Sequence, residues 1–260
     1  MSVGPISVPT WTKRLLLVNI AVFVVLFILG KTGYTISGAL AVNPGWWWTE
    51  PPFLPLWQVV TYGFLHDLSG FGHILFNSLT LFFFGGMLER SLGGRRFLTL
   101  YFGAMIAGGV LHALLGPIDL FGGPMVGASG AIMACIVACA MLFPRAQMIL
   151  FVFPIPLWVG ATGLVVMDLL GFAKAGGQVA HHVHLAGALA GFLYIKQRWH
   201  LRELRSPVEA LADARRAGAE RSRKQDEERM DELLAKISRE GMGSLSKVER
   251  EFLKRMSERP

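Results

Sequence analysis

The sequence contains little cysteine and little charge. Only two of its 260 residues are cysteines, Cys135 and Cys139, and they stand one helical turn apart in an apolar run. This spacing excludes a disulfide framework and a Cys-x-x-Cys redox or zinc site, so we interpret both as small packing residues. Charged residues make up 17% of the chain, against about 25% in an average soluble domain. With 53% apolar residues and a mean hydropathy of +0.47, the composition predicts a membrane protein.

The charges that are present lie mostly at one end. Residues 1–195 carry 13 charged side chains and residues 196–260 carry 30, of which 17 are basic and 13 acidic. This mixture is unlike the basic stripe with interleaved aromatics of a nucleic-acid surface, so we expect no nucleic-acid partner. We predict a membrane domain over residues 1–198 and a charged cytoplasmic tail over residues 199–260.

Six apolar segments have, or nearly have, the length of about 20 residues that a membrane-spanning helix needs. No small-residue cleavage site follows the first, which predicts an uncleaved span. Prolines interrupt the start of the fifth, so its helix should begin near Leu157, after an apolar lead-in at the membrane interface. The predicted fold class is all-α, a polytopic bundle of six transmembrane helices. The segments are Leu15–Gly30, Phe71–Leu88, Phe97–Leu115, Met125–Phe143, a stretch within Met148–Leu170, and Val179–Ile195.

Basic residues beside the segments predict the orientation of the bundle. One orientation leaves only Lys31 and Lys174 on the outer side. Both termini should then face the cytoplasm, in a multi-pass protein of the inner (plasma) membrane, and the second, fourth and sixth spans run inward. The eight basic residues on the inner side are Lys13, Arg14, Arg90, Arg95, Arg96, Arg145, Lys196 and Arg198.

Three polar residues stand near the starts of these three parallel spans: His73, Ser129 and His184. Polar and ionisable groups inside a bilayer are energetically costly, so they are candidates for function. Because the three spans run in the same direction, the three side chains should lie at similar depth. The sequence predicts one polar site close to the outer face.

The tetrapeptide Gly127-Ala128-Ser129-Gly130 opens the fourth span. Glycines beside a serine let a substrate backbone approach its hydroxyl, and the unpaired N–H groups of a first helical turn suit an oxyanion. The alternative is a small-residue packing face, since Gly130, Ala134 and Ala138 recur every four residues.

Gly187 and Gly191 share the helical face of His184 and predict close packing against a neighbouring helix. If that helix is the fourth span, the imidazole and the Ser129 hydroxyl form a base and nucleophile pair. The alternatives are an interhelical hydrogen bond and a metal cluster with His181 and His182. His182 lies on another face and no His-Glu-x-x-His motif is present, so we expect no metal.

Two further polar groups are candidates. His73 and Asn77, one turn apart, suit stabilisation of an oxyanion, or form a buried pair that joins helices. Asp168, near the outer end of the fifth span, has two interpretations. It is a third catalytic residue that orients the histidine, or it is a helix cap or a contact between helices.

Together these blocks resemble the rhomboid family of intramembrane serine proteases, over roughly residues 11–198. The resemblance implies that Ser129 is the nucleophile and His184 the general base, without an obligatory carboxylate. It places His73, Asn77 and the Ser129 N–H in the oxyanion hole, and implies transmembrane substrates cut near their outer ends, contact with membrane lipid, and no cofactor.

The supporting candidates are Gly127, Gly130, Met133, His181, Gly187 and Gly191. The matching blocks are Thr12–Phe23, Trp57-Gln58, Thr61–His66, His73–Asn77, Phe84–Gly86 with Glu89 and Gly93, Gly127–Gly130, and His181 with Val183–Gly187.

Three departures accompany the resemblance. Gln58 stands where an arginine often anchors the outer loop, Met133 stands where an aromatic residue often stacks on the histidine, and the interval from His66 to His73 predicts an extended loop. The alternative function is a catalytically silent scaffold or quality-control binder of transmembrane helices. The presence of both Ser129 and His184 argues against it.

The charged tail contains its own helical pattern. Met230, Leu233, Leu234 and Ile237 follow amphipathic spacing, Ser246 to Glu249 is a capping box, and Val248, Phe252 and Met256 lie on one side of the helix that it opens. We predict a helical hairpin over residues 226–258, preceded by a charged helix or flexible linker over 203–224. The segment from Leu233 to Phe252 resembles a module that follows some bacterial rhomboid domains. Its partner is unknown, and the alternative is a solvated tail.

Overall fold

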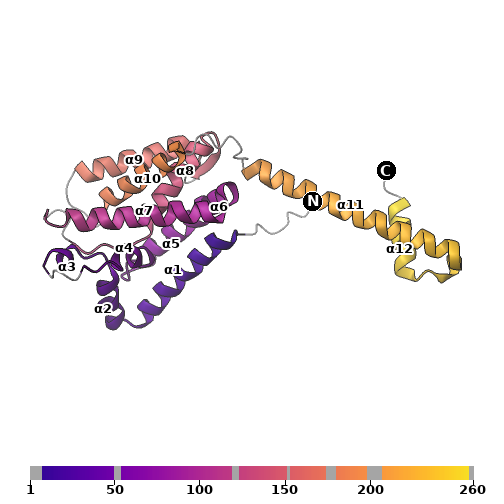
Figure 1. Cartoon of the computed structure of the whole chain (residues 1–260), viewed down its shortest axis with the longest axis horizontal. Coiled ribbons are helices and arrows are strands. Elements are labelled where there is room, and N and C mark those ends of the chain that lie inside the picture. Colours follow the sequence, from indigo (N-terminus) through magenta and orange to yellow (C-terminus); the bar gives the residue numbers. More distant parts are fainter. Residues whose placement is uncertain are drawn as a thin grey trace. The chain divides into compact units, whose positions relative to one another are not determined.

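A computed structural model describes residues 8–49, 54–118, 123–150, 153–173, 180–197 and 207–257. Most of the described residues are helical (Figure 1). The chain divides into two compact units, residues 1–206 and 207–260.

Two described helices are long and apolar enough to cross a membrane, α1 (Thr10–Ile28) and α7 (Gly94–Leu115). Two shorter apolar helices are α8 (Ser129–Leu142) and α9 (Leu157–Ala173). Large apolar side chains remain exposed along α1, where Ile28 is 76% exposed, as expected for a helix surrounded by lipid. The predicted helical character is confirmed, whereas the count of six spans stays a prediction.

The second predicted span is helical but irregular. It comprises α5 (Gly72–Thr80), a π-helical turn η2 (Leu81–Gly85) and α6 (Gly86–Leu92), which follow one another directly. Gly93, at φ +80°, ends α6 just before α7 begins, in the left-handed conformation that glycine adopts easily. The shorter helices between α1 and α5 are α2 (Lys31–Leu40), α3 (Pro44–Thr49), α4 (Gln58–Thr61) and η1 (Tyr62–Phe64).

The lead-in to the fifth segment contains a β-hairpin, which the sequence analysis did not predict. Strand β1 (Gln147–Leu150) pairs antiparallel with β2 (Phe153–Pro156). A two-stranded ribbon tolerates Pro154 and Pro156 because an edge strand leaves some N–H positions without a partner. Helix α9 begins at Leu157 as predicted.

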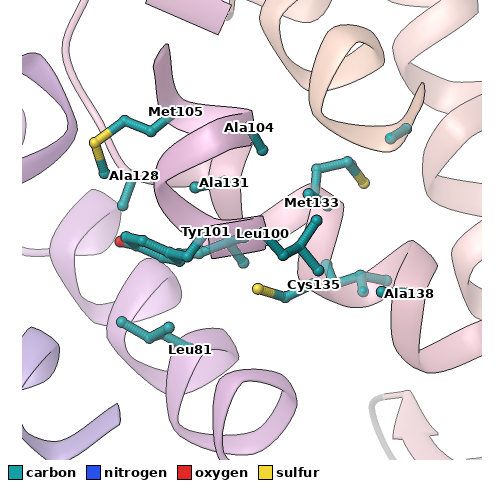
Figure 2. Close-up of a cluster of buried hydrophobic side chains, with 14 of the residues drawn as sticks. Leu81, Leu100, Tyr101, Ala104, Met105, Ala128, Ala131, Met133, Cys135 and Ala138 are labelled. Carbon is teal, nitrogen blue, oxygen red and sulfur yellow. The ribbon is translucent and has the colours of Figure 1, made fainter. Parts of the chain in front are cut away.

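Helix α8 forms the centre of the first unit. It packs against α7, α9 and α10 (His181–Gln197), and these four helices lie together in Figure 1. Figure 2 shows Tyr101 and Met105 of α7 beside small residues of the segment that leads into and forms α8. Cys135 and Cys139 are buried free thiols, which confirms their interpretation as packing residues.

Glu89 joins the end of α6 to the start of α1. Its carboxylate accepts hydrogen bonds from the backbone N–H groups of Trp11 (2.9 Å) and Thr12 (2.7 Å) and from the Thr12 hydroxyl (2.8 Å). The first N–H groups of a helix have no partner within it, so Glu89 caps α1 from 77 residues away.

The second unit consists of α11 (Pro207–Glu240), the turn η4 (Met242–Ser244) and α12 (Lys247–Ser257). Leu233, Leu245 and Phe252 form its small core. The capping box is confirmed, because Ser246 N–H donates to Glu249 (2.7 Å) and Glu249 N–H donates to the Ser246 hydroxyl (3.3 Å).

Three details of the predicted hairpin are corrected. Leu234 and Val248 are 52% and 65% exposed, because the two helices meet along a narrower stripe than the spacing implied, and Leu245 and Leu253 pack there instead. The alternative of a flexible linker is wrong for residues 207–224, which continue α11. Residues 203–206 and 258 lie outside the described residues.

Candidate active site

Ser129 and His184 form a hydrogen-bonded pair. Ser129 is the first residue of α8, and His184 lies in the first turn of α10. The Ser129 Oγ and the His184 Nε2 are 2.7 Å apart. The side chain of His184 is 17% exposed. The predicted neighbour of the sixth segment is therefore the fourth.

Glycines bring these two helices into backbone contact. A Cβ on Gly187 would collide with the carbonyl oxygen of Gly130, and a Cβ on Gly191 would collide with that of Ala134. A Cβ on Gly130 would meet the Val183 side chain at 2.8 Å. Small residues allow this close approach in membrane helices, and it determines the separation of Ser129 from His184.

Asp168 of α9 contacts both histidines on one face of α10. Its Oδ1 lies 2.9 Å from His184 Nδ1 and 2.7 Å from His181 Nδ1. An ionised carboxylate only accepts hydrogen bonds, so each Nδ1 carries the proton. A neutral His184 then has a free lone pair on Nε2, which accepts the hydrogen bond from the Ser129 hydroxyl.

The same three side chains also have the composition of a metal site. One ligand atom from each of Asp168, His181 and His184 lies within 4.8 Å of the others. The O···N distances of 2.7 and 2.9 Å are ordinary for hydrogen bonds. Zinc would require the protons to leave both Nδ1 atoms and the ligands to approach to about 2.0–2.2 Å.

His73 is the second residue of α5, and Asn77 lies one turn after it. Asp67 N–H donates to His73 Nδ1 at 3.3 Å, so the proton of a neutral His73 ring is on Nε2. A Cβ on Gly127, whose φ is +123°, would lie 2.8 Å from that Nε2 and 3.8 Å from Ser129 Oγ, so the His73 ring borders the serine. Asn77 Nδ2 donates to the His73 carbonyl at 3.0 Å, and its second amide hydrogen is left for another acceptor.

The loop between His66 and His73 has its own hydrogen bonds. The Asp67 carboxylate accepts from the N–H (2.9 Å) and the hydroxyl (2.8 Å) of Ser69. These two donors hold the pKa of Asp67 below its ordinary value. The interval that departs from the family pattern is thus an ordered turn, which presents a backbone N–H to His73.

Two contacts that the sequence did not predict hold the segment that leads to Ser129. Tyr62 O accepts from Gly127 N–H at 2.9 Å, and His112 Nε2 lies 2.9 Å from Gly123 O. His112 Nδ1 in turn lies 2.8 Å from His182 Nε2, which confirms that His182 faces away from the other two histidines. The sequence feature that could have identified His112 is that it is an ionisable residue in an apolar segment.

Gln58 anchors the outer segment in place of the arginine that the family often carries. Its side chain is completely buried. Its Oε1 accepts from Asn43 N–H and Trp47 Nε1, both at 3.1 Å, and its Nε2 donates to Ala39 O at 3.2 Å. The other departure, Met133, is buried in the core around α8 and drawn in Figure 2.

Comparisons with known proteins identify the family of the chain. A family profile described as "Rhomboid domain" matches residues 54–200, and one described as "Family of unknown function (DUF6576)" matches residues 219–259. The chain is 36% identical over 129 residues to Rhomboid protein 1, mitochondrial, of Saccharomyces cerevisiae, which covers 48% of this chain and 37% of that protein.

Bacterial proteins show a similar likeness. The putative rhomboid protease YdcA of Bacillus subtilis is 41% identical over 101 residues, 39% of this chain and 42% of that protein. The rhomboid protease GlpG of Haemophilus influenzae is 31% identical over 146 residues, 54% of this chain and 68% of that protein. The chain thus spans less than half the length of the yeast and Bacillus relatives.

Proposed function

Because the chain belongs to the rhomboid family of membrane proteins, we propose that it is an intramembrane serine protease that cuts transmembrane helices near the outer face of the membrane. The hydrogen bond of 2.7 Å between Ser129 Oγ and His184 Nε2 is the observation that carries the proposal. A hydroxyl is a weak nucleophile until an adjacent base accepts its proton. Here the base accepts at Nε2 because its other nitrogen donates to Asp168.

The reaction proceeds by acyl transfer. Ser129 Oγ attacks the substrate carbonyl carbon while its proton passes to His184 Nε2, and the carbonyl oxygen becomes an oxyanion. His184 then gives that proton to the leaving amine as the C–N bond breaks. A water molecule releases the acyl group by the reverse sequence of proton transfers, which regenerates Ser129.

Three N–H donors are available for the oxyanion. The His73 Nε2–H borders Ser129, Asn77 retains one amide hydrogen, and the backbone N–H of Ser129 lies in the first turn of α8, where no partner exists within the helix. Donors positioned in advance favour the charge that develops in the transition state. We assign the oxyanion hole to these three residues.

The proposal includes six spans: α1, the α5–η2–α6 segment, α7, α8, α9 and α10. The basic flanks support cytoplasmic termini in an inner membrane, so the starts of α5, α8 and α10 lie at the outer side. A peptide bond in a helix has its N–H and C=O already paired, so the substrate must unwind locally at the outer side. We propose transmembrane proteins and lipid as partners of the first unit.

A cleavage assay tests the function. The full chain in vesicles is incubated with a single-span test substrate whose outer end carries a small residue before the cut. We expect cleavage by the unmodified protein and none by His184→Ala or Ser129→Ala. Binding of the substrate by all three proteins without cleavage would instead support a silent scaffold.

A further inference from the structure

The structure assigns Asp168 as a positioning residue that completes a Ser129–His184–Asp168 triad. This inference rests on the proposed function and deepens it, because the resemblance implies a pair of residues without an obligatory carboxylate. The hydrogen bonds of the Asp168 carboxylate go to His181 and His184, so Asp168 acts through the imidazole of His184. Two observations carry the assignment: the arrangement of the three groups, and the way in which the surrounding helices hold the carboxylate.

The three groups are connected by two consecutive hydrogen bonds. The distance from Ser129 Oγ to His184 Nε2 is 2.7 Å, and the distance from His184 Nδ1 to Asp168 Oδ1 is 2.9 Å. Such a carboxylate orients the imidazole, selects the tautomer with Nδ1–H and stabilises the imidazolium that forms during attack. The Ser129 hydroxyl alone does not select the tautomer of His184, because a hydroxyl can donate to Nε2 or accept from it.

The carboxylate itself is held in place. Asp168 is buried, and the same Oδ1 that faces His184 accepts a second hydrogen bond from His181 Nδ1 at 2.7 Å. The ring of His181 fits only because residue 171, one turn after Asp168, is glycine, since a Cβ there would collide with that ring. His181, one turn before His184, thus helps to aim Asp168 at the base.

The decisive experiment combines kinetics with the protonation of the histidine rings. The full chain is purified with nitrogen-15 histidine, and the signal that disappears from the spectrum of His184→Gln is assigned to His184 among the seven histidines. We expect the proton on Nδ1 of His184 in the unmodified protein. A His184 that is neutral with its proton on Nε2 would overturn the assignment, even if no Asp168 variant folds.

The kinetic arm uses Asp168→Ala and Asp168→Asn on the single-span substrate. We expect kcat to fall by up to about ten-thousandfold, as it does when the carboxylate of a Ser–His–Asp triad is lost, with KM within about twofold. The matched control is Glu89→Gln, which alters a buried carboxylate outside the site and should leave kcat per folded molecule unchanged. A full kcat in Asp168→Ala would overturn the inference while the proposed protease activity stands.

A measurement of zinc binding distinguishes the triad from a metal site formed by the same three side chains. We expect purified protein to bind zinc no better than Asp168→Ala does, and cleavage to persist in a chelator. Stoichiometric zinc that is lost in Asp168→Ala would overturn the triad in favour of a metal site. If the unmodified protein does not cleave, the proposed function fails, whereas the spectrum still tests the contact between Asp168 and His184.

Discussion

Gly187 of α10 lies against the carbonyl oxygen of Gly130 in α8, with no room for a Cβ between them. Gly130 directly follows Ser129, and Gly187 lies one turn after His184. The contact therefore determines how closely the two helices approach at the site. The geometry of the Ser129–His184 pair depends on two residues that have no side chains.

Replacement of Gly187 by alanine should separate α8 from α10. We expect a lower melting temperature, equivalent to about 1–3 kcal/mol for an overpacked core, and a loss of cleavage because His184 moves away from Ser129. Gly163→Ala in α9 is the control, since a Cβ at that position meets nothing within 4 Å. Equal activity of Gly187→Ala and the unmodified protein would contradict this account of the interface.

His73 and Asn77 are expected to act on the transition state. His73→Ala and Asn77→Ala should each lower kcat on the order of a hundredfold to a thousandfold, as the loss of one oxyanion donor does, with little change in KM. Thr80→Val is a control on the same helix, because the Thr80 hydroxyl only donates to Phe76 O. A rise in KM at constant kcat would instead indicate that the two residues bind substrate.

Glu89 should contribute to stability and not to catalysis. Glu89→Ala leaves two N–H groups at the start of α1 and the Thr12 hydroxyl without their acceptor. We expect a loss of about 1–3 kcal/mol, measured as a lower melting temperature, and a smaller loss in Glu89→Gln, which keeps one oxygen. If Glu89→Ala melts like the unmodified protein, the carboxylate does not hold α1.

The second unit should become less stable in acid. The Ser246 N–H donates to Glu249, and Lys236 donates as well, at 3.1 Å. These contacts lower the pKa of Glu249 from about 4.5 to about 2. Because the folded pKa is the lower one, the stabilising effect is complete above pH 4.5 and is lost as the pH falls toward 2.

Methyl resonances of Leu233 and Leu245 in the full chain report the loss of stability as the pH falls, since both side chains pack beside Phe252. Glu249→Gln should weaken the unit near neutral pH and flatten the acid transition. Glu251→Gln, an exposed neighbour on the same helix, should leave the transition in place. An acid transition that persists in Glu249→Gln would assign it to another group.

The sequence carried enough information to predict that Ser129 and His184 lie together, because much of the signal is local. Ser129 follows a glycine turn at a helix start, and the spacing of Gly187 and Gly191 identifies the packed face of α10. Both features can be recognised within a single segment of the sequence. The capping box of α12 is equally local, since Ser246 and Glu249 bond to each other.

Other contacts depend on the relative orientation of separate helices, which the sequence of one segment does not indicate. The bonds from Asp168 to His181 and His184 require α9 to turn one face toward α10. The pairing of His112 with His182 joins residues 70 positions apart. The exposure of Leu234 and Val248 likewise depends on which faces of α11 and α12 pack in the small core.

Labelling with a serine-directed fluorophosphonate tests the central claim most directly. The full chain in vesicles is treated with the probe, digested and analysed by mass spectrometry to locate the modified residue. The account predicts modification at Ser129 that disappears in Ser129→Ala and falls sharply in His184→Ala. Labelling that persists unchanged in Ser129→Ala would contradict it.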